Sequence, residues 1–181
     1  MSELFSIQLQ NRQQQGRDGI WLDLPTTTEQ VQAALRQIGI SSDNPQGLFI
    51  SGYFAEEEKR FAIPYNMVLA SNVDELNFLA SRLETLSTGE RAELNAALQA
   101  PQSELFSIGR ITDFPENVDY YVHLPDVHGP AQLGDYYLNR SGMVDMPEEW
   151  KGGIDTAQFG RYVAQQEQGV FTAVSYTHLT L

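Results

Sequence analysis

The chain has 181 residues, a formal net charge of −13 at pH 7 and no cysteine. A chain this acidic does not suit direct binding to a nucleic acid backbone, which is held by Lys and Arg, and the missing thiols exclude disulfides and thiolate metal sites. A hydrophobic fraction of 41% is enough for a packed core. No apolar run approaches about 18 residues, and residues 1–16 lack the pattern of a signal peptide, so we expect a cytoplasmic protein without membrane contact.

Residues 1–71 predict a first small domain, an antiparallel sheet with one helix. Apolar runs or apolar–polar alternation predict three strands, at residues 4–9, 20–24 and 48–54. Thr26 and Glu29 have the spacing of a capping box, in which each side chain binds the backbone N–H of the other residue. The helix that they open is expected to end at Gly39.

Residues 72–115 predict a second, helical domain. Ser71 or Asn72 can cap its first helix. Apolar residues then recur at helical spacing, at Val73, Leu76, Leu79, Ala80 and Leu83. Ser87 and Glu90 form a second capping-box pair. A unit this small buries little surface alone, so we expect it to pack against its neighbours.

The hexapeptide SELFSI occurs twice, at residues 2–7 and 103–108. The first copy lies in a predicted strand, whereas the second follows Pro101 and can open a short helix. The flanking residues share nothing further, so the repeat does not predict a repeat architecture. If the second copy opens a helix, its context overrides its local sequence.

Residues 116–181 predict a third domain, a small sheet with helices. Strands are predicted at residues 118–124 and 169–174, and helices at Gly129-Pro130, at Pro147 and at residues 154–165. The three segments together predict an α+β fold, an N-terminal sheet with a helix, a helical unit and a C-terminal sheet with helices.

The negative charge is concentrated in the last three-fifths of the chain. Residues 73–181 hold 16 acidic and 6 basic side chains, against 8 and 5 before them. Within this region, residues 113–149 carry eight acids and a single base, Arg140. Like charges this dense repel one another, so the stretch is either a solvated face or a surface for a partner. For Glu148 and Glu149 the dipole of a predicted helix is a sufficient explanation.

Motifs that carry chemistry are sparse. His123, Asp126 and His128 give H-x-x-D-x-H, a set of possible metal donors that fits no metal-site spacing. The alternatives are a hydrolase site and ordinary loop residues. The sequence has no G-x-S-x-G elbow and no glycine-rich phosphate loop. We therefore predict no enzyme, no cofactor and no metal, but an acidic protein that binds another protein.

Several segments, taken in order, resemble the ArdA antirestriction family. They are IWLDLP at 20–25 before a capped helix, FISGYF at 49–54, IPYN at 63–66, VDELNFLASRLETLS at 73–87, LGDYYLNRSGMVDMPEEW at 133–150 and IDTAQFGRYV at 154–163. The last two resemble the antirestriction motif of the family and the segment after it. The resemblance extends over nearly the whole chain.

The resemblance implies an inhibitor that imitates bent B-form DNA and occupies the DNA-binding groove of Type I restriction–modification enzymes, formed by the DNA-recognition and methyltransferase subunits. It also implies an elongated chain of three small domains that dimerises through the C-terminal domain. Carboxylates would stand where the enzyme expects phosphates, so binding should weaken with salt. The charge of a dimer, twice −13 or −26, corresponds to about 44 Å of duplex at about one charge per 1.7 Å.

The carboxylates expected to stand in for phosphates form two sets. The first set is Asp113, Glu116, Asp119, Asp126, Asp135, Asp145, Glu148 and Glu149, and the second is Asp74, Glu75, Glu84, Glu90 and Glu93. Tyr136, Tyr137 and Trp150 are expected to pack within the third domain or across the dimer.

A rival hypothesis is an acidic adaptor for another basic protein, such as a transcriptional regulator or a conjugation factor. It predicts one compact acidic patch, whereas a DNA mimic predicts a continuous negative surface. Residues 175–181, SYTHLTL, depart from the family and resemble translated sequencing-adapter read-through, so we expect the native end to differ there.

Overall fold

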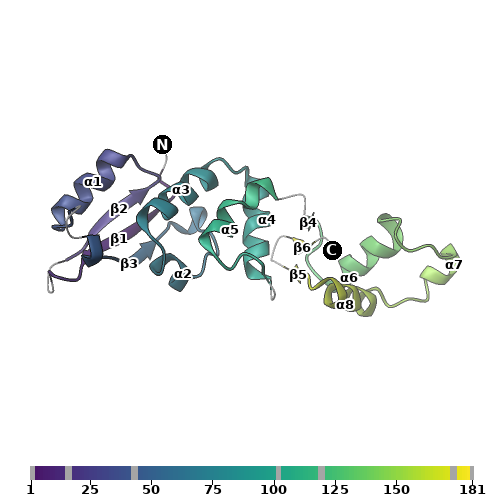
Figure 1. The fold of residues 1–181 in the computed structure, drawn as a ribbon. Coiled ribbons are helices and arrows are strands. Elements are labelled where there is room, and N and C mark those ends of the chain that lie inside the picture. Colours follow the sequence, from purple (N-terminus) through teal and green to yellow (C-terminus); the bar gives the residue numbers. More distant parts are fainter. Residues whose placement is uncertain are drawn as a thin grey trace. The chain divides into compact units, whose positions relative to one another are not determined.

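The computed structural model describes residues 3–14, 18–41, 45–100, 103–117, 121–171 and 175–179 (Figure 1). The chain divides into two compact units, an N-terminal unit of residues 1–91 and 105–115 and a C-terminal unit of residues 92–104 and 116–181. Each unit contains helices and a three-stranded antiparallel sheet. The prediction of an α+β fold is confirmed, and the division into three small domains stays a prediction.

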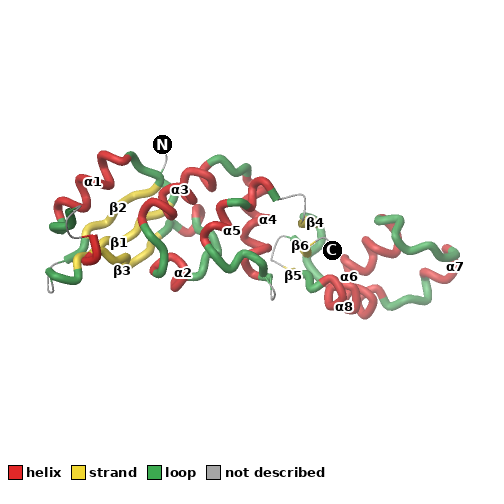
Figure 2. Tube along the Cα trace, viewed as in Figure 1, coloured by secondary structure: helices red, strands yellow, loops and turns green. Residues whose placement is uncertain are grey.

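The N-terminal unit is built on a sheet with the strand order β2-β1-β3 (Figure 2). β1 spans Phe5–Asn11, β2 spans Ile20–Leu24 and β3 spans Leu48–Phe54, in agreement with the three predicted strands. Successive side chains of a strand point to opposite faces. One face carries Ile7, Leu9 and Leu24, each 0% exposed, and forms part of the core.

Helix α1, Thr28–Gln37, is closed by a capping box, but not by the predicted pair. Thr27 is the N-cap and Gln30 is its partner, so the predicted box of Thr26 and Glu29 is wrong by one residue. A glutamine reaches back to the N-cap backbone as a glutamate does, so the sequence offers two equivalent pairs in adjacent positions.

The end of α1 is formed as predicted. Gly39 has a φ of +70°, a conformation that residues with a Cβ rarely adopt. The side chain of Asn11 at the end of β1 donates through Nδ2 to the carbonyl oxygen of Ile38 at 2.9 Å. This bond satisfies a carbonyl that the helix leaves without a partner and joins α1 to the sheet.

The chain after β3 is helical. α2 spans Tyr65–Leu69, α3 Val73–Glu84, α4 Thr88–Gln99 and α5 Ile108–Thr112, and 3-10 turns lie at Glu57–Lys59 and Phe114–Glu116. A further 3-10 turn, Pro45–Gly47, lies directly before β3. Asn72 caps α3 as predicted, accepting the Glu75 N–H at 2.9 Å, and all five predicted apolar positions of α3 are buried. The predicted box of Ser87 and Glu90 is confirmed at the start of α4.

The two copies of SELFSI adopt different structures. In the first copy Phe5 lies in β1 and is 2% exposed, whereas its counterpart Phe106 lies in a loop and is 67% exposed. Ser107 of the second copy caps α5 by accepting the Arg110 N–H at 3.3 Å. Identical residues thus form a strand or a helix start according to their surroundings, as expected.

The C-terminal unit holds the second sheet, with the strand order β4-β6-β5. β4 spans Tyr121–Leu124, β5 Val170–Phe171 and β6 Tyr176–Leu179. β4 and β5 lie within the predicted strands, of which residues 118–120 and 172–174 fall outside the described residues. No strand was expected within residues 175–181, yet β6 is the central strand and its Tyr176 is 0% exposed. Residues 176–179 do not alternate strictly between apolar and polar, since Thr177 and His178 are both polar, so the pattern does not predict a strand.

The helices of the C-terminal unit include a closely packed pair, α6 and α8. α6 spans Pro130–Asp135 and continues as a π-helical turn η5 at Tyr136–Arg140, and α7 spans Glu148–Lys151 and α8 Thr156–Glu167. The predicted helix starts at Gly129-Pro130 and Pro147 are confirmed. A Cβ at Gly134 in α6 would overlap the backbone carbonyl of Thr156, and one at Gly160 in α8 would overlap that of Pro130. The two helices therefore meet at backbone distance because both positions lack a side chain.

The carboxylate of Glu167 holds the core of the C-terminal unit together. It accepts hydrogen bonds from the hydroxyl groups of Tyr137 and Tyr176, the latter at 2.8 Å. Burial raises the pKa of both tyrosines, and the hydrogen bond to the carboxylate raises it further. Both hydroxyl groups therefore stay protonated donors, and Glu167 connects α8 with η5 and β6.

Candidate partner-binding surface

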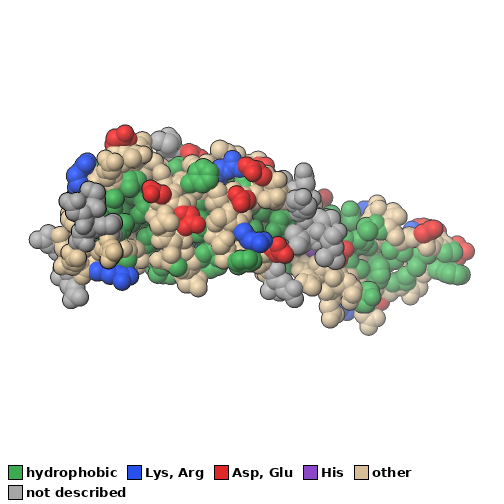
Figure 3. Space-filling model, viewed as in Figure 1, with side chains coloured by type: hydrophobic (Ala, Val, Ile, Leu, Met, Phe, Trp, Pro, Cys, Tyr) green, Lys and Arg blue, Asp and Glu red, His purple; other side chains and the backbone are tan. Residues whose placement is uncertain are grey.

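The first predicted set of acids lies mostly at the surface of the C-terminal unit. Its exposed members are Asp113, Glu116, Asp126, Asp145, Glu148 and Glu149. Asp135 is half-buried, and Asp119 lies outside the described residues. Of the whole set only Asp113 belongs to the N-terminal unit. Figure 3 shows acidic side chains over α7, at the end of the C-terminal unit.

Two members of this set have cationic neighbours. Asp135 Oδ2 lies 3.1 Å from the guanidinium of Arg140, and Glu148 Oε2 lies 2.9 Å from Nζ of Lys151. Three of these four side chains are about half exposed or more, and exposed pairs are worth only about 0–1 kcal/mol. A strongly basic partner can therefore compete for these carboxylates at little cost.

The second predicted set lies on the helices. Asp74 is exposed, and Glu75, Glu84, Glu90 and Glu93 are half-buried. The carboxylate of Glu90 accepts hydrogen bonds from the Ser87 hydroxyl at 2.6 Å and from its N–H at 2.8 Å, which lowers the pKa of Glu90. Glu75 also pairs with its helix cap, since Asn72 Nδ2 lies 3.4 Å from its carboxylate. Two members of the set therefore close helix ends in addition to carrying charge.

Several arginines of the chain lie over aromatic rings. The guanidinium carbon is 5.4 Å from the ring centre of Phe49 for Arg12, 4.6 Å from that of Phe61 for Arg91, 4.6 Å from that of Phe106 for Arg110, and 5.8 Å from that of Tyr136 for Arg140. Such contacts are worth about 0.5–1 kcal/mol at exposed sites. They give the cations a neighbour other than a carboxylate.

Tyr136, Tyr137 and Trp150, the aromatic residues predicted to pack within the third domain or across a dimer, differ in exposure. Tyr137 is 7% exposed in the core, and Tyr136 packs against it edge to face with ring centres 5.5 Å apart. Trp150 is 65% exposed, and Met143 and Tyr162 of the same unit are 74% and 60% exposed. Figure 3 shows hydrophobic side chains gathered over α6 and α7. We call Met143, Trp150 and Tyr162 the C-terminal apolar residues.

The side chains of the histidine–aspartate motif are not gathered into one group. Asp126 and His128 are exposed, and His123 is half-buried in β4. The backbone N–H of His128 donates to Gln132 Oε1 at 2.7 Å, as in an ordinary turn before a helix. Within the part of the chain that the structure describes, no group of three or more His, Asp or Glu side chains is placed to hold a metal ion.

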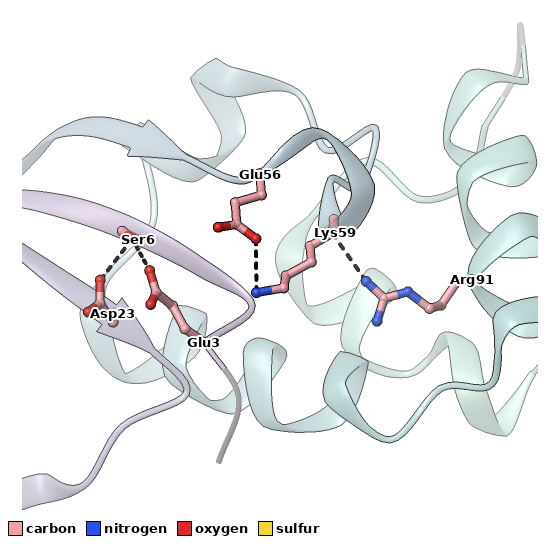
Figure 4. A network of polar contacts seen from close by, with 6 residues as sticks. All are labelled: Glu3, Ser6, Asp23, Glu56, Lys59 and Arg91. Atoms are coloured by element: carbon pink, nitrogen blue, oxygen red, sulfur yellow. Dashed lines mark hydrogen bonds and ion pairs between the residues drawn. The ribbon is translucent and has the colours of Figure 1, made fainter.

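A small hollow in the N-terminal unit is lined by part of the polar network of Figure 4. It is lined by Glu3, Leu4, Phe5, Ser6, Phe54, Ala55, Glu56 and Lys59, and its volume is about 10 Å³. Lys59 Nζ pairs with Glu56 at 3.0 Å, and its carbonyl accepts from Arg91 at 3.2 Å. A hollow of this size holds at most about one water molecule, so it is not a substrate site.

Exposed aromatic residues of the N-terminal unit were not singled out from the sequence. Trp21 is 48% exposed and Phe54 is 58% exposed. The alternation in IWLDL could have predicted the exposure of Trp21, because it places Trp21 on the face opposite to the buried Leu22 and Leu24. For Phe54 the strand pairing was needed, and the sequence alone does not give the register.

The fold and composition together define an acidic α+β protein, and most of the described candidate acids of the first set are exposed. Among the described residues, no helix is long and apolar enough to cross a membrane.

The family of the chain follows from comparison with known proteins. The model of the family described as antirestriction protein (ArdA) matches residues 15–178, nearly the whole chain. The chain therefore belongs to the ArdA family, whose members act in antirestriction against restriction enzymes. No curated protein matches the sequence significantly.

Proposed function

We propose that the chain inhibits a Type I restriction–modification enzyme by imitating B-form DNA in its DNA-binding groove. The observation that carries the proposal is the surplus of exposed carboxylates in the C-terminal unit, which has 11 acidic and 3 basic side chains. A groove that binds DNA presents Lys and Arg to phosphates. Carboxylates at the surface offer the same groups an alternative partner.

A homodimer is part of this proposal. The C-terminal apolar residues expose 60% or more of their surface. If they form one patch, that patch would suit a contact with a second copy. Joining two copies through the C-terminal unit would double the charge to −26 and bring the more acidic units together. The negative surface would then extend across the interface.

The decisive experiment is displacement of DNA. A Type I methyltransferase core (recognition plus modification subunits) is bound to a labelled duplex, and the protein is titrated in at about 0.05 M and about 0.2 M salt. We expect displacement at low salt that weakens steeply at high salt, because both competitors rely on the same cations. Albumin of matched negative charge serves as the control for non-specific acidity.

If the duplex stays bound at low salt with a large excess of protein, DNA mimicry is wrong. The adaptor hypothesis would then take its place, and a different basic partner would have to be sought. Displacement that is independent of salt would also contradict the proposal, because it would indicate a contact that does not depend on phosphate-binding cations.

A further inference from the structure

One face of the N-terminal sheet combines exposed aromatic rings with carboxylates. In the strand register, Ser6 of β1 lies between Asp23 of β2 and Phe54 of β3. Directly paired residues share a face, and Trp21 shares it with Asp23 because the two are two residues apart on β2. We call Trp21, Asp23, Phe54 and the adjacent Glu3 the Trp21 face. It is the face opposite to the buried Ile7, Leu9 and Leu24.

The carboxylates of this face meet at a single hydroxyl group. Ser6 Oγ lies 2.8 Å from Asp23 Oδ1 and 3.2 Å from Glu3 Oε1, and Figure 4 shows the two acids reaching it from either side. One hydroxyl has one proton, so it donates to only one carboxylate at a time. Two negative charges are therefore held near each other beside an exposed phenyl ring.

The rings lie close enough to the carboxylates to act with them. Adjacent strands are about 4.8 Å apart, and residues two apart on one strand are about 7 Å apart. Asp23 and Phe54 therefore lie on either side of Ser6 and about 10 Å from each other, and Trp21 lies about 7 Å from Asp23 along β2. The indole extends toward β3, where a Cβ at Gly52 would lie 3.0 Å from its ring carbon Cη2.

The chain itself shows which ligand suits such rings. On the same sheet, Arg12 lies over Phe49 with its guanidinium carbon 5.4 Å from the ring centre. Within the described part of the chain, no cation lies over Trp21 or Phe54. Trp offers the strongest ring for a cation, and a planar guanidinium stacks on rings in a way that an ammonium does not.

We propose that the Trp21 face binds arginine side chains of the partner protein. Guanidinium groups stack on Trp21 and Phe54, and their N–H groups donate to the carboxylates of Asp23 and Glu3. The identity of the partner, the DNA-binding surface of a restriction enzyme, rests on the proposed function. The chemistry of the face does not, because it requires only exposed arginines.

This face adds a contact of a different kind from phosphate mimicry. Attraction between exposed charges is screened at about 8–10 Å in physiological salt, whereas stacking of a desolvated guanidinium on a ring is short-range. The Trp21 face should therefore supply the part of the affinity that remains when the salt concentration is raised.

The first test is a double substitution, Trp21→Ala with Phe54→Ala. We expect displacement of the duplex from the methyltransferase core to weaken about five- to thirtyfold at about 0.2 M salt, from two contacts of about 0.5–1 kcal/mol each. Phe106→Ala is the matched control, since Phe106 is 67% exposed in the same unit but already lies beneath Arg110. Its effect should stay within about twofold. Thermal unfolding of each variant checks the fold.

If the wild-type protein displaces DNA and the double variant does so equally well, the inference is wrong. A double variant that changes the oligomeric state in sedimentation would also overturn it, because the face would then be covered by a second copy.

The second test does not depend on the restriction enzyme. The sequence has two tryptophans, so the Trp150→Phe protein reports on Trp21 alone. We expect an arginine-rich peptide to change the Trp21 fluorescence at lower concentration than a lysine peptide of the same length and charge. Equal responses, or none, would overturn the inference even if wild-type protein displaces DNA. Failure of the wild-type displacement alone would contradict only the proposed function.

Discussion

The two units of this chain differ in charge and in what they leave exposed. The N-terminal unit has 13 acidic and 8 basic side chains, a net charge of −5 over 102 residues, and the C-terminal unit has 11 and 3, a net charge of −8 over 79 residues. The second unit thus carries about twice as much negative charge per residue. Charge repulsion opposes folding. The core of the C-terminal unit must therefore offset more repulsion per residue than the core of the N-terminal unit.

The cores of the two units differ in one respect. The N-terminal unit buries apolar side chains between a sheet and helices, as Leu76, Leu79 and Leu83 of α3 show at 0% exposure. The C-terminal unit also buries apolar side chains, among them Val127, Leu133 and Tyr176. In addition, it brings two helices into backbone contact through Gly134 and Gly160. The packing of these helices therefore depends on two positions that lack a side chain.

The largest expected effect is therefore on the glycines. In Gly160→Ala the added methyl group meets the backbone carbonyl of Pro130, which cannot move away as a side chain can. Overpacking of this kind costs about 1–3 kcal/mol or more. We expect the C-terminal unit to unfold at a lower urea concentration. The measurement is the fluorescence of Trp150 during urea unfolding, in a Trp21→Phe background.

The matched control is Gly152→Ala, in the same unit, where a Cβ would meet nothing within 4 Å. The urea unfolding midpoint of Gly152→Ala should stay close to that of the Trp21→Phe protein in which it is made. If Gly160→Ala unfolds with the same midpoint as Gly152→Ala, helix contact through glycine does not stabilise this unit, and the contrast between the two cores would have to be given up.

The next effect concerns the charges themselves. Neutralising three exposed acids of the C-terminal unit, with Asp126→Asn, Asp145→Asn and Glu149→Gln, removes up to three phosphate stand-ins. The slope of log affinity against log salt should become shallower, because fewer carboxylates pair with the cations of the partner and exposed ion pairs are screened by salt. The measurement is the salt dependence of binding to the methyltransferase core.

The control triple neutralises exposed acids of the N-terminal unit, with Glu29→Gln, Glu57→Gln and Glu58→Gln. It changes the net charge of the protein equally. The proposal expects a smaller change of slope here. Equal slopes for the two triple variants would show that the net charge of the protein determines the salt dependence of binding, and that the surface of the C-terminal unit has no special role.

Much of the local structure could be predicted from the sequence. The strands of the first sheet, the cap of α3 and the box of Ser87 follow from short-range patterns, because a strand alternation or a cap is complete within a few residues. The pair of Gly134 and Gly160 could not be predicted, since each glycine is explained only by a helix more than 20 residues away. The same applies to β6, whose strand character comes from its place between β4 and β5.

The candidate surface was predictable as a composition but not as an arrangement. The sequence shows how many acids there are. It does not show that Asp135 and Glu148 have cationic neighbours or that Glu75 and Glu90 close helix ends. The rings of Trp21 and Phe54 are joined into one face by strand register, which no local pattern encodes.

A smaller effect is expected from the cap of α8. Asp155 accepts the N–H groups of Ala157 at 2.9 Å and Gln158 at 3.0 Å. Loss of such a cap costs about 1 kcal/mol, so Asp155→Ala should lower the urea midpoint of the C-terminal unit less than Gly160→Ala does. Asp155→Asn can keep the bonds and should restore most of the loss. If the asparagine variant is as unstable as the alanine variant, the charge of the Asp155 carboxylate stabilises α8 and its hydrogen bonds to the helix end do not.

The smallest effect is a pH dependence in the N-terminal unit. The hydrogen bonds from the Ser87 hydroxyl and N–H lower the pKa of Glu90 below its ordinary value of 4.5. A group whose folded pKa is lowered stabilises the fold above its unfolded pKa and loses that contribution as the pH falls through the folded pKa. Glu90→Gln removes the titration while keeping an acceptor for the box. The difference in unfolding midpoint between wild type and this variant should therefore shrink between pH 7 and pH 3. NMR titration of the Glu90 side chain gives the pKa directly. A value at or above 4.5 would show that the box holds Glu90 without favouring its charge, and the pH dependence would then have to arise elsewhere in the acidic surface.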